Sequence, residues 1–146
     1  MRLRPKGEIK LLSFLNLKNP EQEYLMTKKQ PSDSLPLFDL ESARERTGGD
    51  EDFLKELLSL YEEEFKAKLP ELKTAWQARN FKEIKELSHS LKGASANLSL
   101  LSLQKICWEL EQAGQQKDEK KIEVLLPQLE KEFEKVWHYL QQEKFL

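Results

Sequence analysis

The sequence predicts an all-α protein: an up-down-up-down antiparallel four-helix bundle with a short extra N-terminal helix. Three observations support this fold class. Leu, Glu and Lys dominate a composition with only 5 Gly and 6 Pro, which favours helix over sheet. Apolar residues recur at three- and four-residue spacing along four long segments. The connections between these segments are short, so that consecutive helices should pack as antiparallel neighbours.

The first quarter of the chain differs in pattern from the rest. Residues 1–36 show no sustained period and contain Pro20, Pro31, Pro36 and a polar stretch at residues 28–34, so we expect a flexible N-terminal arm or linker there. Residues 37–146 are expected to form the bundle domain. Residues 1–35 carry seven basic and four acidic side chains, a net charge of +3 that leaves −5 for the remainder.

Capping residues predict where each helix begins and ends. A short helix should begin after Asp39, end at Arg46 and stop at Gly48-Gly49. The four long helices are expected at residues 51–76 after Asp50, at 81–98 after Asn80 with Glu83 in a capping box, at 100–113, and at 119–140 after Asp118. Gly114 is expected to stop the third of these. Pro70 should kink or split the first, and Pro127 should bend the last or mark its effective start.

Composition argues against several classes of function. A net charge of −2 with no basic patch argues against nucleic-acid binding. No apolar stretch approaches the ~20 residues of a membrane span. The single cysteine, Cys107, allows no internal disulfide and fits a reducing compartment, so we expect a cytoplasmic protein. Glycine-rich phosphate loops, zinc-spaced Cys/His clusters and G-x-S-x-G are also missing from the sequence.

One helix carries a histidine on its polar side. Between residues 81 and 98 the apolar positions are Ile84, Leu87, Leu91, Ala94 and Leu98. At ~100° per residue these five cluster on one face, and His89 falls ~180° from their centre, so it should face outward. Gly93 and Ala96, one and two turns further on, share that outer face. A glycine inside a helix costs about 1 kcal/mol relative to alanine, but small residues here leave room for a docking protein.

The chemistry that this surface indicates is nucleophilic. An exposed imidazole is mostly uncharged at neutral pH, and its unprotonated ring nitrogen is a nucleophile. Lys82, Lys85 and Lys92 border the same surface, and Lys92 can reach an anion bonded to the ring. In an antiparallel hairpin with the next helix, His89 lies opposite Glu111 to within about one helical turn. A hydrogen bond from Nδ1–H to Glu111 would leave Nε2 as the attacking atom.

Two other hypotheses use the same residues differently. A helical adaptor would bind a receiver domain or another signalling partner without being phosphorylated. A metal-dependent oxidase would use Glu86 and His89 as Glu-x-x-His, one half of the di-metal bundle motif. The second half is missing, because Lys135 stands three residues before His138, and the predicted outward orientation of His89 also disagrees with a metal ligand.

The segment His89–Leu98 resembles the signature of histidine phosphotransfer (HPt) domains, roughly H-x-L-K-G-x-x-x-x-L-G. The histidine, lysine, glycine and leucines fall at the spacing of that family. Gly48-Gly49-Asp50 and Glu109-Leu110-Glu111 are also similar, and the resemblance covers roughly residues 38–143. Ser99 departs from the pattern, because the family usually has glycine there to close the helix in a left-handed conformation.

The resemblance implies a function and a set of roles. His89 would accept a phosphoryl group, Lys92 would stabilise it, Gly93 would leave room for the partner, and Glu111 would orient the imidazole. The implied partners are response-regulator receiver domains or a hybrid sensor histidine kinase, with Mg²⁺ supplied by the receiver and no cofactor in this chain. We therefore expect a monomeric phosphocarrier without kinase activity of its own, whose partner surface includes Lys82, Lys85, Gly93 and Ala96.

Overall fold

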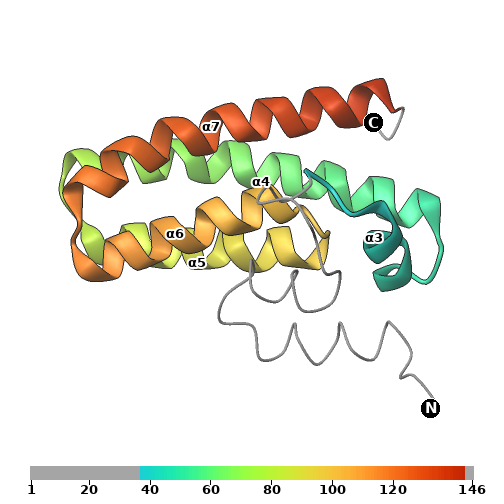
Figure 1. The fold of residues 1–146 in the computed structure, drawn as a ribbon, viewed down its shortest axis with the longest axis horizontal. Helices are drawn as coiled ribbons and strands as arrows, with labels where there is room; N and C mark the ends of the chain where they lie inside the picture. The colour runs from blue at the N-terminus through green and yellow to red at the C-terminus, as the bar shows by residue number, and fades with distance from the viewer. Residues whose placement is uncertain (1–36, 144–146) are drawn as a thin grey trace, which may run out of the picture.

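The computed structural model describes residues 37–143, and within that range the chain forms helices joined by turns, with no strand (Figure 1). The helices are α3 (Leu40–Arg46), α4 (Glu51–Gln77), α5 (Phe81–Asn97), α6 (Leu101–Gln116) and α7 (Glu119–Gln142). The four long helices alternate in direction, and α3 lies at one end of the bundle. The predicted all-α bundle with a short extra helix is confirmed. The predicted arm, residues 1–36, lies outside the described residues.

Four of the five helices begin at the side-chain caps that the sequence predicts. Each capping oxygen accepts a hydrogen bond from a backbone N–H of the first turn, and such a bond is worth about 1 kcal/mol. The pairs are Asp39 with Ser42, Asp50 with Phe53, Asn80 with Glu83 and Asp118 with Lys121. Acidic residues in these first turns also favour the positive end of each helix dipole.

The structure removes one alternative for each proline and contradicts the prediction for Gly114. Helix α4 continues through Pro70 without splitting, and α7 begins at Glu119, well before Pro127. Gly114 does not stop α6, which continues to Gln116. The helix ends instead at Lys117, whose φ of 57° is left-handed and reverses the chain. Gly114 is therefore an interior helix residue whose small size needs another explanation.

Each turn between the long helices contains a left-handed residue that is not glycine. These are Arg79 between α4 and α5, Ser99 between α5 and α6, and Lys117 between α6 and α7. Ser99 thus keeps the conformation for which glycine is usual, with a φ of 57°. Its carbonyl accepts from the Asp39 N–H at 3.0 Å, and its hydroxyl donates to Ser42 Oγ at 2.8 Å. Both bonds fasten α3 to the α5–α6 turn.

The core is continuous along the bundle. The largest fully buried side chains are Leu54, Leu58, Phe65, Leu72, Ile84, Leu91, Leu100, Leu103, Leu110, Ile122, Leu129 and Leu140. Aromatic rings fill the space between α4 and α7, where Phe65 and Phe133 stack with centroids 4.0 Å apart. Helices α5 and α6 share the most extensive interface. Among residues 37–143, no helix is both long and apolar enough to cross a membrane.

Candidate functional site

His89 projects from the middle of α5 into solvent. Its side chain is 67% exposed, whereas Ile84 and Leu91 on the other side of the helix are fully buried. This orientation agrees with the one that the apolar seam of the helix predicts. The imidazole can therefore be reached by another protein without any rearrangement of the bundle.

Glu111 of α6 holds one nitrogen of that ring. Its Oε2 lies 2.9 Å from His89 Nδ1, and the residue is only 8% exposed. Because an ionised carboxylate can only accept hydrogen bonds, the imidazole must donate from Nδ1–H. In the neutral ring, Nε2 then carries the lone pair on the exposed side. The hairpin register predicts this contact, and its chemical consequence is a ring with a fixed nucleophilic nitrogen.

Lys92 lies against the second oxygen of the same carboxylate. Its Nζ is 2.8 Å from Glu111 Oε1, and the lysine side chain is only 12% exposed. The contact is an ion pair that is largely shielded from solvent. The cation that the sequence places within reach of the ring is therefore held by Glu111, between the two helices, rather than extended into solvent.

The other predicted site residues differ in accessibility. Lys82 is exposed and Lys85 is half-buried. A Cβ on Gly93 would meet nothing within 4 Å, so this glycine leaves open space beside His89. Ala96 corrects the prediction, because it is only 3% exposed and cannot contribute an open contact surface.

A buried polar layer beneath the site was not predicted. Tyr61 OH lies 2.7 Å from Ser95 Oγ, which itself donates to the Leu91 carbonyl at 2.8 Å. Tyr61 therefore donates to Ser95, and both hydroxyl groups have a partner, whereas Oγ of Ser88 has none among the described residues. Ser88 is also fully buried. The missed signal was the alternation of Ser88, Leu91, Ser95 and Leu98 at three- and four-residue spacing, which places both serines on the inner face.

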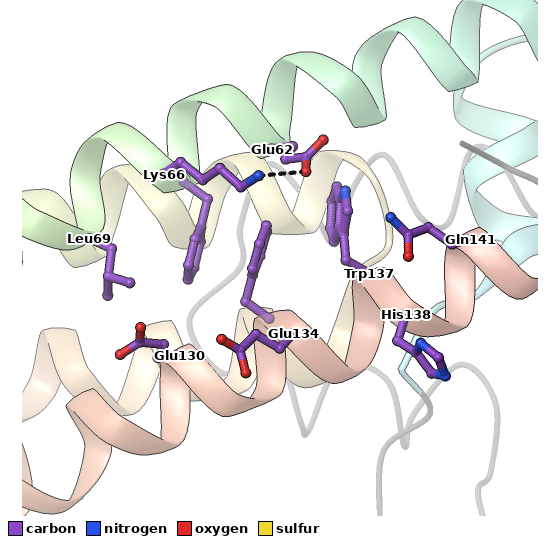
Figure 2. Close-up of a pocket in the computed structure, with 10 residues that line it drawn as sticks. Glu62, Lys66, Leu69, Glu130, Glu134, Trp137, His138 and Gln141 are labelled. Atoms are coloured by element: carbon purple, nitrogen blue, oxygen red, sulfur yellow. Dashed lines mark hydrogen bonds and ion pairs between the residues drawn. The ribbon is translucent and has the colours of Figure 1, made fainter.

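A pocket of about 400 Å³ lies between α4 and α7, apart from His89 (Figure 2). Its floor is aromatic, and Glu62, Lys66, Glu130 and Glu134 surround it. His138 is at its edge with the ring turned away from Lys66 and Glu62. Across the part of the chain that the structure describes, no three His, Cys, Asp or Glu side chains are arranged to hold a metal ion.

The chain is a member of the Hpt domain family. The sequence model of that family, described as the Hpt domain, matches residues 56–139, which include His89, Lys92 and Glu111. The match spans more than half of the chain.

Two individual proteins are similar to this chain. A phosphorelay intermediate protein, rdeA of Dictyostelium discoideum, is 28% identical over 103 residues, covering 70% of this chain and 41% of that protein. The chain thus spans less than half the length of this relative. The crystal structure of histidine-containing phosphotransfer protein B (HptB) from Pseudomonas aeruginosa PAO1 is 28% identical. It superposes with a TM-score of 0.69, covering 75% of this chain and 96% of HptB.

Proposed function

We propose that this chain is the intermediate carrier of a multistep phosphorelay, which holds a phosphoryl group on His89 between aspartates of receiver domains. One observation carries the proposal: the ring is 67% exposed while its Nδ1 is hydrogen-bonded at 2.9 Å to a buried carboxylate. Membership in the Hpt family and similarity to two phosphotransfer proteins support it.

The transfer step uses the nitrogen that Glu111 leaves without a proton. The Nε2 lone pair forms the new N–P bond while the P–O bond to the receiver aspartate breaks, and the aspartate carboxylate leaves with that electron pair. No proton has to leave Nε2, because the ring proton is on Nδ1. Positive charge develops on the ring during attack, and the Glu111 carboxylate 2.9 Å away stabilises it.

Lys92 is proposed to act after the N–P bond forms. Its Nζ lies 2.8 Å from Glu111 Oε1. Lys92 comes three residues after His89, so the two side chains are neighbours on the surface of α5. A phosphoryl group on Nε2 brings new negative charge to this surface. We propose that the ammonium group then divides its attraction between Glu111 and the phosphoryl oxygens, which would slow loss of the group to water.

The partners and setting are proposals of the same kind. Receiver domains or a hybrid sensor histidine kinase would dock over Gly93, Lys82 and Lys85, and the receiver would supply Mg²⁺ and the transfer machinery. The chain would have no kinase activity of its own. A monomeric state and a cytoplasmic location stay predictions from the sequence.

The test is transfer from a receiver domain whose aspartate carries radioactive phosphate. We expect acid-labile, alkali-stable label on this chain, and none on the His89→Gln variant, which keeps a polar side chain of similar size. Label on the variant, or none on the native chain with any receiver tried, would contradict the proposal. If both chains bind a receiver equally and neither is labelled, the helical adaptor is the better description.

A further inference from the structure

Gly114 of α6 packs directly against the backbone of α5. A Cβ built at this residue would be 3.1 Å from the backbone N of Lys85, 3.3 Å from the backbone O of Phe81 and 3.2 Å from Cγ2 of Ile84. The distance to Ile84 Cγ2 is shorter than the roughly 3.5–4.0 Å between carbon atoms in ordinary contact. Two of the three neighbours are backbone atoms of α5, so a methyl group here would require the backbones of α5 and α6 to give way by a few tenths of an ångström.

The usual reasons for a glycine do not apply at this position. Helix α6 continues for two residues beyond Gly114 and is closed by Lys117 in the left-handed conformation. In a helix interior, alanine is the more stable residue. The close approach of the two backbones is thus the feature that requires a residue without a side chain.

The contact at Gly114 lies one helical turn from the functional pair. Glu111 comes three residues before Gly114 on α6, and His89 comes four residues after Lys85 on α5. Because the helices are antiparallel, both steps lead in the same direction along the bundle (Figure 1). A change in helix separation at Gly114 is therefore expected to alter the 2.9 Å distance between Glu111 Oε2 and His89 Nδ1 as well.

We propose that Gly114 is a positioning residue for His89. Its missing side chain sets the separation at which the Glu111 carboxylate reaches Nδ1–H, and so fixes the tautomer with a nucleophilic Nε2. The inference rests on the proposed function only in that Nε2 is taken as the attacking atom. Gly93, by contrast, faces open space, and an added methyl group there leaves the helix separation unchanged.

The primary test compares the tautomer of His89 in the native chain, Gly114→Ala and Gly93→Ala. Nitrogen NMR of the labelled imidazole at mildly alkaline pH reports which ring nitrogen carries the proton. We expect a dominant Nδ1–H form in the native chain and in Gly93→Ala, and a mixture of both forms in Gly114→Ala. An unchanged tautomer in Gly114→Ala would overturn the proposal. This readout needs no receiver, so it still decides the proposal if phosphoryl transfer is never observed.

Transfer from a labelled receiver gives a second readout. Gly114→Ala should slow transfer about threefold to tenfold, the effect of a weakened hydrogen bond in the transition state. In a Glu111→Ala background the same substitution should change the rate by less than about twofold, because Gly114 acts through Glu111. Equal effects in both backgrounds would indicate general damage to the fold and overturn the proposal.

A second variant keeps the test decisive if Gly114→Ala does not fold. Glu111→Asp withdraws the carboxylate by one methylene group without adding any atom between the helices. If the separation at Gly114 matters because it sets the reach of Glu111, this variant should show the same mixture of tautomers. A fully retained Nδ1–H form in Glu111→Asp would show that reach is not critical and would contradict the proposal.

Discussion

The carboxylate of Glu111 lies 2.9 Å from Nδ1 of His89, although the two residues are 22 positions apart and on different helices. Its second oxygen lies 2.8 Å from Nζ of Lys92. One largely buried anion therefore holds both the nucleophilic ring and the nearby cation. The orientation of the ring and the charge beside it can be altered separately by changing one partner at a time.

Replacing the anion with a neutral isostere tests the orienting role. We expect Glu111→Gln to slow phosphoryl transfer to His89 by about tenfold. The amide keeps the shape and one acceptor oxygen, but it has no charge to favour the Nδ1–H form or to stabilise the ring during attack. Single-turnover transfer from a labelled receiver measures the effect, with His89→Gln as the baseline and circular dichroism as the check of folding. A native rate would mean that Glu111 is a structural residue only.

Lys92 should affect the lifetime of the phosphohistidine more than its formation. Lys92→Gln should shorten the half-life of the label on His89, whereas Lys92→Arg should largely preserve it. The same Gln variant should lower the free energy of unfolding by about 1–3 kcal/mol, because it leaves a largely buried carboxylate without its cation. Label decay after removal of the receiver, together with urea unfolding, measures both effects.

A surface pair supplies the matched control for Lys92. Lys66 pairs with Glu62 at 3.0 Å on α4, but the lysine side chain is 65% exposed. Lys66→Gln should therefore change the free energy of unfolding by less than about 0.5 kcal/mol and leave the label half-life unchanged. If the Lys92 and Lys66 variants change the free energy of unfolding and the label half-life equally, the burial of Lys92 does not explain its effect.

The left-handed residues Ser99 and Lys117 should respond differently to glycine. Lys117 is exposed, so Lys117→Gly should stabilise the chain by about 0.5–1 kcal/mol through relief of the left-handed conformation. Ser99→Gly relieves the same cost but removes the 2.8 Å bond to Ser42, so we expect little gain or a loss. Adding Ser42→Ala removes the stranded hydroxyl and should restore the gain. Thermal unfolding of the native chain, the two single variants and the double variant measures these differences. Equal gains in stability for Lys117→Gly and Ser99→Gly would contradict the prediction.

The sequence predicts those parts of the fold that local chemistry controls. Asp50 and Asn80 begin helices because their side-chain oxygens satisfy backbone N–H groups a few residues away. Gly114 and Ser99 show the limit of this reasoning. A local rule makes Gly114 a helix terminator, but the proximity of α5 explains it. The same rule puts the geometry at Ser99 in doubt, yet hydrogen bonds to α3 hold it.

The same distinction between local pattern and packing applies to the candidate site. The outward orientation of His89 follows from the periodicity of one helix, and its pairing with Glu111 follows from hairpin register. The burial of Ala96 could not be predicted, because the periodicity of α5 does not show what covers its last turn. The 2.8 Å contact of Lys92 with Glu111 also depends on the separation of two helices, which the pattern within either one does not determine.

The buried thiol and phenol beneath the site predict a loss of stability at alkaline pH. Burial raises the pKa of Cys107 from 9.0 to about 12, and burial likewise raises the pKa of Tyr61 well above 10.0. Between these pKa values the folded chain keeps protons that the unfolded chain loses. The contribution of these groups to the free energy of unfolding is therefore complete below pH 9.0 and declines as pH rises toward about 12.

Each such group should lower the free energy of unfolding by up to about 1.4 kcal/mol per pH unit within its window. Cys107→Ala removes the thiol. The free energy of unfolding of this variant should therefore fall less steeply with pH above pH 9.0, and its pH dependence below pH 9.0 should match that of the native chain. Urea unfolding of the native chain and this variant across the pH series measures both slopes. Identical slopes would mean that the thiol already ionises in the folded chain, and alkylation of Cys107 without unfolding would support that contrary result.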